Sequence, residues 1–332
     1  MNTNKKNLLI TLADKNYVAQ AKQFFASVFF NSGWQGDYML LTDDISEEDK
    51  NWFEKKGIIV YSPPLLTPLS LTPRHSPLLL SKLYFFTESF KESWNTIIFY
   101  DCDVIVRGSL DSLLKYQGFS APSGDHFRLE DEYNFEEMSQ EIREKIDPKK
   151  PSFCAGAFTF KTKIITKNTF RELFEMFNNN KKIFKNGDEA LFNLYFYNNW
   201  NTIPAAYNDP INLLKIKYKI KEKRTKSIAI HFIYLPKPWD KESSYHSEWQ
   251  ENLKLAENIN LANRPKAKRE IKNYEIILYR IYIWFKKREA KINKKISLKN
   301  PLLKVDKQIG KIGLKIKKIS PKLYNIIRLK KN

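Results

Sequence analysis

The first third of the chain alternates short apolar runs with amphipathic stretches. Three runs have the length and apolar content of buried strands, at residues 8–13, 38–41 and 58–61. Between the first two, apolar positions recur at helical spacing, and Gly33 stands where a helix would end. Between the second and third, Ser46 and Asp49 resemble a capping box for a helix that Gly57 would end. Strand and helix therefore alternate, which predicts an α/β fold with a parallel sheet.

The rest of the chain continues this mixed pattern. Five prolines between residues 62 and 77 predict an irregular loop, and a helix over 78–90 is expected after it. The next expected elements are strands over 97–100 and 104–106, an acidic helical stretch over 130–144, a strand over 157–160, a helix over 170–177, a helix from residue 188 and a strand over 228–230. Because ligands of such sheets bind at the carboxyl ends of the strands, the polar residues there are the first candidates for chemistry.

Two carboxylates interrupt an apolar segment, IIFYDCDVIVRG, at residues 97–108. Asp101 and Asp103 are two residues apart, so in extended backbone both point to one side and Cys102 faces the other. Two unpaired carboxylates at the end of a buried strand are costly, and a divalent cation that also binds phosphate oxygens removes that cost. A solvated turn is the alternative interpretation, but the four apolar residues before Asp101 favour a metal site.

A second candidate segment is IHFIYLPKPWD, residues 230–240. His231 follows an apolar strand, and imidazole suits Mn²⁺ better than Mg²⁺ as a ligand. Lys237 lies in a proline-containing loop beside Trp239, where it would neutralise a diphosphate as a point charge. Taken alone, a histidine in this position is more often a hydrogen-bonded core residue than a metal ligand.

Five motifs in order resemble glycosyltransferase family 8, which includes glycogenin and bacterial lipooligosaccharide galactosyltransferases. They are ADKNY (13–17), SKL (81–83), DCD (101–103), DEALFN (188–193) and HFIYLPKPW (231–239), so the resemblance covers about residues 8–240. No motif is decisive alone, whereas their order and spacing are specific. The resemblance implies the GT-A fold, a Rossmann-like mixed sheet with helices on both faces. It also implies transfer of a sugar from a nucleotide-sugar donor with retention at the anomeric carbon.

The resemblance further implies roles for individual residues. The ligands of a Mn²⁺ or Mg²⁺ ion on the donor diphosphate would be Asp101, Asp103 and His231. The nucleoside pocket, for uridine, would be lined by Ala13, Asp14 and Asn16. Lys82 would reach the donor sugar or phosphate, and Lys237 would add a second positive charge at the diphosphate. The alternatives are that Asp14 caps a helix and that Lys82 is a solvated helix lysine.

The chain departs from the family pattern in segments that would face the sugars. Cys154 stands where bacterial members commonly have asparagine, and Asp188-Glu189 stands where the family usually has Asp-Gln. A glutamate beneath the anomeric carbon would be able to act as a nucleophile, whereas a glutamine only stabilises an oxocarbenium-like state during same-face attack. We favour same-face attack in which Asp188 or Glu189 stabilises charge. The alternative is a glutamate placed at a helix N-terminus by the helix dipole.

Charge divides the chain into a catalytic domain over 1–240 and a basic helical region over 241–332. From residue 264 to the end there are 23 Lys and Arg against four acidic residues, which is +19 of the formal net charge of +20. The stretch 271–288 is amphipathic and carries interfacial aromatic residues, which are Tyr274, Tyr279, Tyr282 and Trp284. This pattern is typical of a helix on an anionic membrane surface. A solvated extension or a nucleic-acid-binding tail would carry the same charge, but no nucleic-acid motif accompanies it.

Cysteine content and hydropathy bear on location. Cys102 and Cys154 are the two cysteines of the chain, so no disulfide framework organises the fold and a reducing compartment fits. The apolar run near residue 8 is too short for a signal-peptide core, and no run approaches the roughly 18 apolar residues of a spanning helix. We therefore expect a cytoplasmic protein bound peripherally to the inner face of the cytoplasmic membrane.

Together these patterns predict a metal-dependent, retaining hexosyltransferase. Its donor would be a UDP-sugar, with galactose or glucose as the hexose. Its acceptor would be a lipid-linked or cell-surface glycan of lipopolysaccharide, lipooligosaccharide or capsule. The alternative is a non-catalytic, membrane-associated protein that keeps the fold and binds a nucleotide-sugar or a glycan. Cys154 and Glu189 leave that alternative open, and metal-dependent turnover separates the two.

Overall fold

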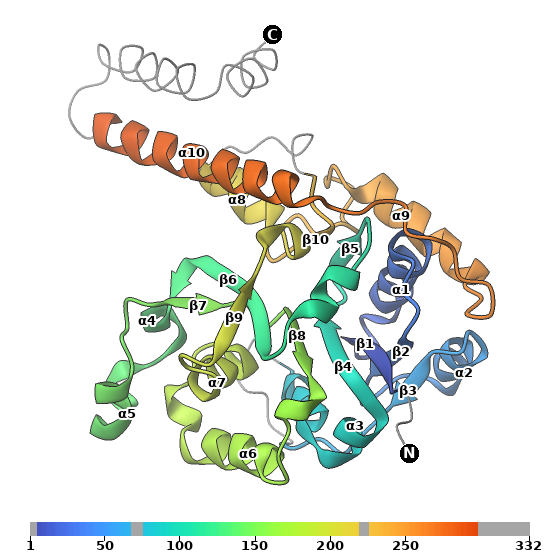
Figure 1. Cartoon of the computed structure of the whole chain (residues 1–332), viewed down its shortest axis with the longest axis horizontal. Helices are drawn as coiled ribbons and strands as arrows, with labels where there is room; N and C mark the ends of the chain where they lie inside the picture. Colours follow the sequence, from blue (N-terminus) through green and yellow to red (C-terminus); the bar gives the residue numbers. More distant parts are fainter. Residues whose placement is uncertain (1–4, 68–75, 219–225, 298–332) are drawn as a thin grey trace.

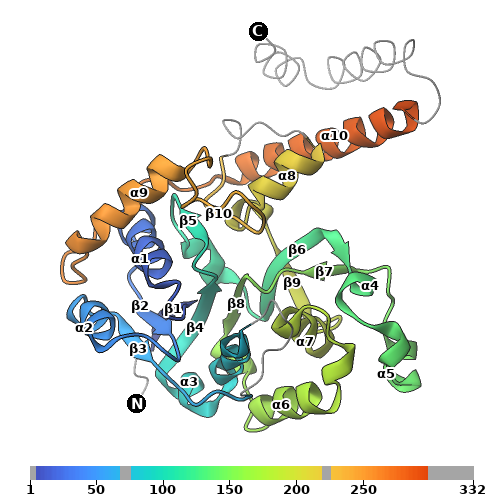
Figure 2. The ribbon, with the colours of Figure 1, turned by 180° about the vertical axis from the view of Figure 1, so that it is seen from behind.

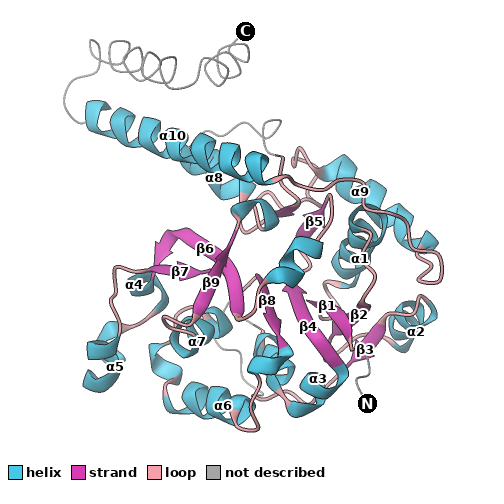
Figure 3. Ribbon diagram, viewed as in Figure 1, coloured by secondary structure: helices cyan, strands magenta, loops and turns pink. Residues whose placement is uncertain are grey.

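The computed structural model describes residues 5–67, 76–218 and 226–297. Within them, an eight-stranded mixed sheet forms the centre, and helices cover both of its faces (Figure 1; Figure 3). The strand order is β3-β2-β1-β4-β8-β6-β7, with β9 paired to β6. A separate two-stranded sheet joins β10 to β5.

The N-terminal half of the sheet is parallel. Its strands are β1 (Lys6–Leu12), β2 (Asp37–Leu41), β3 (Ile59–Tyr61) and β4 (Trp94–Tyr100). The connecting helices are α1 (Val18–Ser32) and α2 (Glu47–Lys55). Gly33 has the left-handed φ of 67° that ends α1, and the Ser46 hydroxyl accepts the N–H of Asp49 at the start of α2. The predicted elements of this half are confirmed.

Two apolar clusters fill the space on either side of the sheet, and β4 contributes to both. Ile97 and Phe99 pack into one cluster, while Ile98 and Tyr100 pack into the other. A strand that is buried on both faces has no polar alternation, which explains the continuous apolar run in the sequence. Successive side chains continue to point to opposite faces past the end of the strand, so Cys102 joins the second cluster while Asp101 does not.

The second half of the sheet is more irregular. It holds β6 (Phe119–Arg128), β7 (Pro151–Phe153) and β8 (Ala157–Lys161) in antiparallel pairs, with β9 (Trp200–Ile203) parallel to β6. Its helices are α3 (Glu88–Ser93), α4 (Leu129–Glu132), α5 (Gln140–Lys145), α6 (Thr169–Asn179) and α7 (Gly187–Tyr195). The short 3₁₀ segments are η1 (Pro77–Phe86), η2 (Asp111–Lys115), η3 (Phe135–Glu137), η4 (Thr162–Ile164), η5 (Lys181–Ile183), η6 (Ala205–Tyr207) and η8 (Ala256–Asn258).

Two predicted helices are wrong in detail. The helix expected over 78–90 is the 3₁₀ helix η1 followed by α3, because Thr87 is extended and its hydroxyl bonds back to the Tyr84 carbonyl. The acidic stretch over 130–144 divides into α4, η3 and α5, since Ser139 starts a new helix by accepting the N–H of Ile142. The predicted proline-containing loop is irregular over 62–67, and its residues 68–75 lie outside the described part of the chain.

The last described elements pack on one end of the molecule. These are α8 (Ile211–Tyr218), β10 (Ala229–His231), α9 (His246–Leu255) and α10 (Asn273–Ser297). α9 packs against α1, and α10 lies along α8, as the front and rear views both show (Figure 1; Figure 2). The division of the chain at residue 240 stays a prediction, and the tail over 298–332 lies outside the described residues.

Candidate active site

The two aspartates follow the carboxyl end of β4, at the centre of the sheet. The Asp101 N–H donates to the Gly156 carbonyl at 2.9 Å, which continues the pairing of β4 with β8 past the strand end. After Asp103 the chain enters β5 (Val104–Val106), whose antiparallel pairing with β10 sets Val104 opposite His231. Two short strands thereby bring residues that are 128 positions apart in the sequence to one turn.

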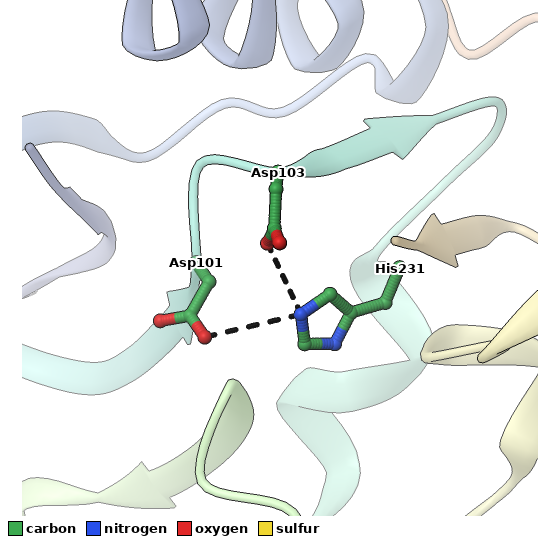
Figure 4. Close-up of side chains that lie close together, drawn as sticks. All are labelled: Asp101, Asp103 and His231. Carbon is green, nitrogen blue, oxygen red and sulfur yellow. Dashed lines mark ion pairs between the residues drawn. The ribbon is translucent and has the colours of Figure 1, made fainter. Parts of the chain in front are cut away.

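Asp101, Asp103 and His231 form one cluster. Their side chains converge, and one nitrogen of the imidazole faces both carboxylates (Figure 4). His231 Nε2 lies 3.1 Å from an oxygen of Asp103 and 3.9 Å from an oxygen of Asp101. One ligand atom from each residue lies within 4.8 Å of the others. The sequence therefore predicted which three residues come together, while their role as metal ligands stays a prediction.

Two lysines flank this cluster. Lys237 Nζ donates to Asp103 at 2.7 Å, from the loop that follows β10. Lys82 Nζ, from η1, lies 2.8 Å from Asp188 and 3.4 Å from Asp101. The Lys82 side chain is only 2% exposed and lies over the Phe99 ring, so the alternative of a solvated helix lysine is wrong.

The ionisation of these groups follows from burial and pairing. Burial alone would raise the pKa of Asp103, but His231 and Lys237 outweigh it and hold that pKa below its ordinary range. Burial raises the pKa of Asp101, against the opposing charge of Lys82. Burial would lower the pKa of Lys82, but Asp101 and Asp188 outweigh it and keep that pKa raised. Lys82 is therefore a permanent cation within the site.

The predicted nucleoside-pocket residues lie at the carboxyl end of β1. Ala13 is buried, and its N–H donates to the Leu41 carbonyl. Asp14 does not cap α1, whose N-cap is Tyr17 without a side-chain bond; instead, Asp14 Oδ1 accepts the N–H of Asn16 at 2.8 Å. Asn16 is exposed. Nothing in the geometry assigns a ligand to these residues, so their role stays a prediction.

The DEALFN segment begins α7 on the other side of Lys82. Asp188 is buried and paired with Lys82, as described above, while Glu189 is partly exposed and its Oε2 accepts the N–H of Ala155 at 2.9 Å. Asn193, one turn later, bonds both the N–H and the carbonyl of Phe153. The helix thereby fixes the segment 153–155, which includes Cys154.

The chain matches the sequence profile of glycosyl transferase family 8 over residues 8–243. The chain belongs to glycosyl transferase family 8. The predicted family is thus confirmed, and with it glycosyl transfer as the general chemistry of the protein. No curated protein sequence is similar enough to the chain to count as a match.

Solved structures of glycosyltransferases share the family 8 fold of this chain. One is the galactosyltransferase LgtC in complex with donor and acceptor sugar analogues, 18% identical, with 74% of this chain and 95% of that chain covered and a TM-score of 0.56. The bifunctional glycosyltransferase WbbM is 15% identical, with 87% of this chain and 53% of that chain covered and a TM-score of 0.56. GlyE of Streptococcus pneumoniae TIGR4 is 17% identical, with 81% of this chain and 66% of that chain covered and a TM-score of 0.55. These likenesses confirm the predicted GT-A fold.

The cluster of this family 8 protein fits a divalent cation by its own geometry. Its donor set is two carboxylates and one imidazole, which suits Mn²⁺. Gly156 keeps the space between them open, because a Cβ there would lie 2.5 Å from His231 Cε1 and 2.6 Å from Asp101 Oδ2. Asp103 Oδ1 is buried and faces His231 Nε2 at 3.1 Å. Carboxylate oxygens and an imidazole nitrogen that converge in this way suit a divalent cation.

Asn208 orients the histidine. Its amide Oδ1 lies 3.0 Å from His231 Nδ1, and an amide oxygen only accepts, so we assign the imidazole proton to Nδ1. The other ring nitrogen, Nε2, then faces the two aspartates, which is the orientation that a metal ligand needs. The sequence analysis missed both Asn208 and Gly156. Neither carries a local signal, because one lies after η6 and the other before β8, and only the folded chain brings them to His231.

Replacing Asn208 by alanine is expected to weaken Mn²⁺ binding by about 10- to 100-fold, because the imidazole loses its fixed tautomer and orientation. Titration of the purified protein with Mn²⁺, followed by electron paramagnetic resonance of the free ion, measures this directly. Asn201→Ala, on the exposed edge of β9, is the matched control and should bind Mn²⁺ like the wild type. Unchanged affinity in the Asn208 variant would contradict the assigned role.

Proposed function

We propose that this family 8 protein is a metal-dependent, retaining hexosyltransferase with a UDP-sugar donor, galactose or glucose being the hexose. The observation that carries the proposal is the cluster of two aspartates and a histidine at the end of β4, flanked by two lysines. A nucleoside diphosphate brings negative charge, and this arrangement offers it a cation site and the Lys237 ammonium beside it. LgtC, which shares the fold, was solved in complex with donor and acceptor sugar analogues, and this supports a donor and an acceptor site in the same fold here.

In the proposed mechanism Asp101, Asp103 and His231 hold the metal ion. When bound, a divalent cation supplies positive charge that stabilises a departing diphosphate. Lys237, on the Asp103 side, adds charge at the same place. Lys82 contacts both Asp101 and Asp188, and a sugar attached to that diphosphate would extend toward this pair. Because the Lys82–Asp188 pair is buried, it is pre-oriented for hydrogen bonds to sugar hydroxyls or phosphate.

Retention of the anomeric configuration is proposed to follow from attack by the acceptor on the face that the diphosphate leaves. The departing phosphate oxygen then takes the acceptor proton, and Asp188 or Glu189 stabilises positive charge that develops on the sugar. Ala13, Asp14 and Asn16 at the end of β1 would hold the uridine, since the carboxyl ends of neighbouring parallel strands form one cleft edge.

Release of UDP from UDP-galactose and UDP-glucose tests the proposed activity. With Mn²⁺ present we expect release from one of the two sugars, and removal of the metal by a chelator should stop it. Metal-dependent binding of UDP without release from either sugar, with isolated membrane glycolipids supplied as acceptors, would instead support a non-catalytic binding protein.

We also propose that the protein attaches to anionic membranes and that its acceptor is a lipid-linked glycan. α10 supports this, because its outer face exposes Tyr274, Ile277, Leu278 and Trp284. Tyr274 is 57% and Trp284 is 50% exposed. Tyr279, in contrast, is 8% exposed and is buried against the catalytic body beside Asp209, so it does not belong to the interfacial set that the sequence suggested. No helix among the described residues is both long and apolar enough to cross a membrane.

Removal of residues 298–332 is expected to abolish flotation of the protein with vesicles that contain phosphatidylglycerol. These residues carry eleven Lys and Arg against Asp306, and each basic residue near an anionic surface contributes about 1 kcal/mol. Vesicles of phosphatidylcholine alone are the control and should float neither form. Equal flotation of the full and shortened chains would show that this segment does not provide the attachment.

A further inference from the structure

A cavity of about 700 Å³ lies between α10 and the catalytic body, and none of the metal-cluster residues lines it. This volume is within the range of about 300–1,000 Å³ that small-molecule sites occupy. On α10 the lining includes Arg280, Ile283, Trp284 and Lys287, which are three or four positions apart and therefore share one face of the helix. The other lining residues come from β6, β9 and η6.

The lining of this cavity is largely apolar. Ile281, Trp284 and Phe285 contribute from α10, and none of the three belongs to an apolar cluster of the described residues. The rings of Trp284 and Phe285 contact each other edge to face, with their centroids 4.9 Å apart. Ile203 of β9 and Ala205 of η6 add apolar surface from the catalytic body. Such a lining suits a hydrocarbon chain.

The charged side chains that line the cavity are both basic. Arg280 and Lys287 lie about two helical turns apart, which is a rise of about 10 Å along α10. No acidic side chain is among the described residues of the lining. Hydrocarbon surface beside two positive charges complements a molecule that joins an apolar chain to a negatively charged group.

Trp284 belongs both to this cavity and to the outer face of α10. It lines the cavity, and half of its surface is exposed. The exposed residues Tyr274, Ile277 and Leu278 precede it on the same helix, on the face proposed above to contact the membrane. The cavity is therefore continuous with the surface at which a membrane lipid would be available.

We propose that this cavity binds one anionic phospholipid of the membrane. An acyl chain lies against Ile281, Trp284 and Phe285, and the phosphate lies at Arg280 or Lys287. The inference rests on the proposed membrane attachment for the source of the lipid, and it adds a specific lipid site to a general attraction of the basic tail. Because β6, β9 and η6 also line the cavity, the bound lipid ties the catalytic body itself to the membrane surface.

Binding of monomeric dihexanoylphosphatidylglycerol to the full-length protein, measured by isothermal titration calorimetry, tests the site without a membrane. We expect an affinity at least about tenfold higher than for inorganic phosphate, which lacks the hydrocarbon, or for dihexanoylphosphatidylcholine, which lacks the net negative charge. The titration needs neither UDP nor Mn²⁺, so its result does not depend on the protein being an enzyme.

Filling the cavity locates the binding. Thr202 of β9 lines the cavity and is exposed, so Thr202→Trp adds a ring there without disturbing the core. We expect this variant to bind the lipid at least about tenfold more weakly, because the ring takes the space of the chain. Asn201→Trp is the matched control, since its side chain points to the other face of the strand and does not line the cavity. Thermal unfolding shows whether both variants keep the fold.

Two double variants separate a specific phosphate site from general charge attraction. The first replaces Arg280 and Lys287 by glutamine, and the second replaces Arg288 and Lys291, which are exposed on α10 outside the cavity. Both proteins have the same net charge. We expect the first to lose about tenfold or more in affinity for dihexanoylphosphatidylglycerol and the second to bind like the wild type.

Four results would overturn the proposal: equal weakening by the two double variants, wild-type affinity in Thr202→Trp, equal binding of the two phospholipids, or binding only after removal of residues 298–332. The last result would show that the C-terminal segment of the chain itself occupies the cavity. A protein that binds the lipid with the expected pattern but does not float with phosphatidylglycerol vesicles would overturn the proposed membrane attachment and leave the lipid site standing.

Discussion

Replacement of Asp103 by asparagine is expected to lower metal-dependent release of UDP by about 1,000-fold or more, a loss of about 4 kcal/mol in transition-state stabilisation. The carboxylate is the group that both His231 and Lys237 contact, at 3.1 Å and 2.7 Å. An amide has no charge to offer a cation or Lys237. Initial rates of UDP release at saturating donor and Mn²⁺ measure the effect.

The fold should survive this change, which makes the rate interpretable. Asparagine has the same shape as aspartate, and Lys237 is partly exposed, so water can solvate its ammonium group when the partner is lost. Asp147→Asn, in an exposed turn before β7, is the control and should keep the wild-type rate. If the Asp103 variant released UDP at a rate within about threefold of the wild type, Asp103 would have no role in the mechanism.

Replacement of Gly156 by alanine is expected to lower Mn²⁺ affinity by about 100-fold or more, since it disturbs two ligands together. The added Cβ would meet His231 Cε1 at 2.5 Å and Asp101 Oδ2 at 2.6 Å. Both atoms are side-chain ends, so they can move away, but they then leave the positions that face Asp103. Titration with Mn²⁺ gives the affinity, and thermal unfolding shows whether the fold is kept.

The matched control for this prediction is Gly118→Ala. Its Cβ would meet just one described side-chain atom within contact range, Asn201 Nδ2 at 3.2 Å, away from the cluster. This variant should bind Mn²⁺ with wild-type affinity. If Gly156→Ala also binds Mn²⁺ normally while remaining folded, the space between Asp101 and His231 does not receive the ion.

The parallel half of the fold could be predicted because its signals are local. Buried strands such as β1 and β4 are continuous apolar runs, and Gly33 marks the end of α1 through its own backbone conformation. β6 could not be predicted in this way. Its ten residues include proline, glycine and aspartate, and it is held as a strand by its pairs with β8, β7 and β9 rather than by its own propensity.

The site was predictable to the extent that its residues lie in motifs. Asp101, Asp103 and His231 come together as expected, because each lies at or next to the end of a strand. The burial of Lys82 was not predictable, since its partner Asp188 is 106 residues away.

A crystal of the protein soaked with Mn²⁺ and UDP would test the central claim most directly, through anomalous scattering at the manganese edge. We predict one anomalous peak within coordination distance of Asp101, Asp103 and His231, with the diphosphate of UDP on its open side. A peak elsewhere, or UDP bound in this cleft with no manganese beside the three residues, would contradict the account.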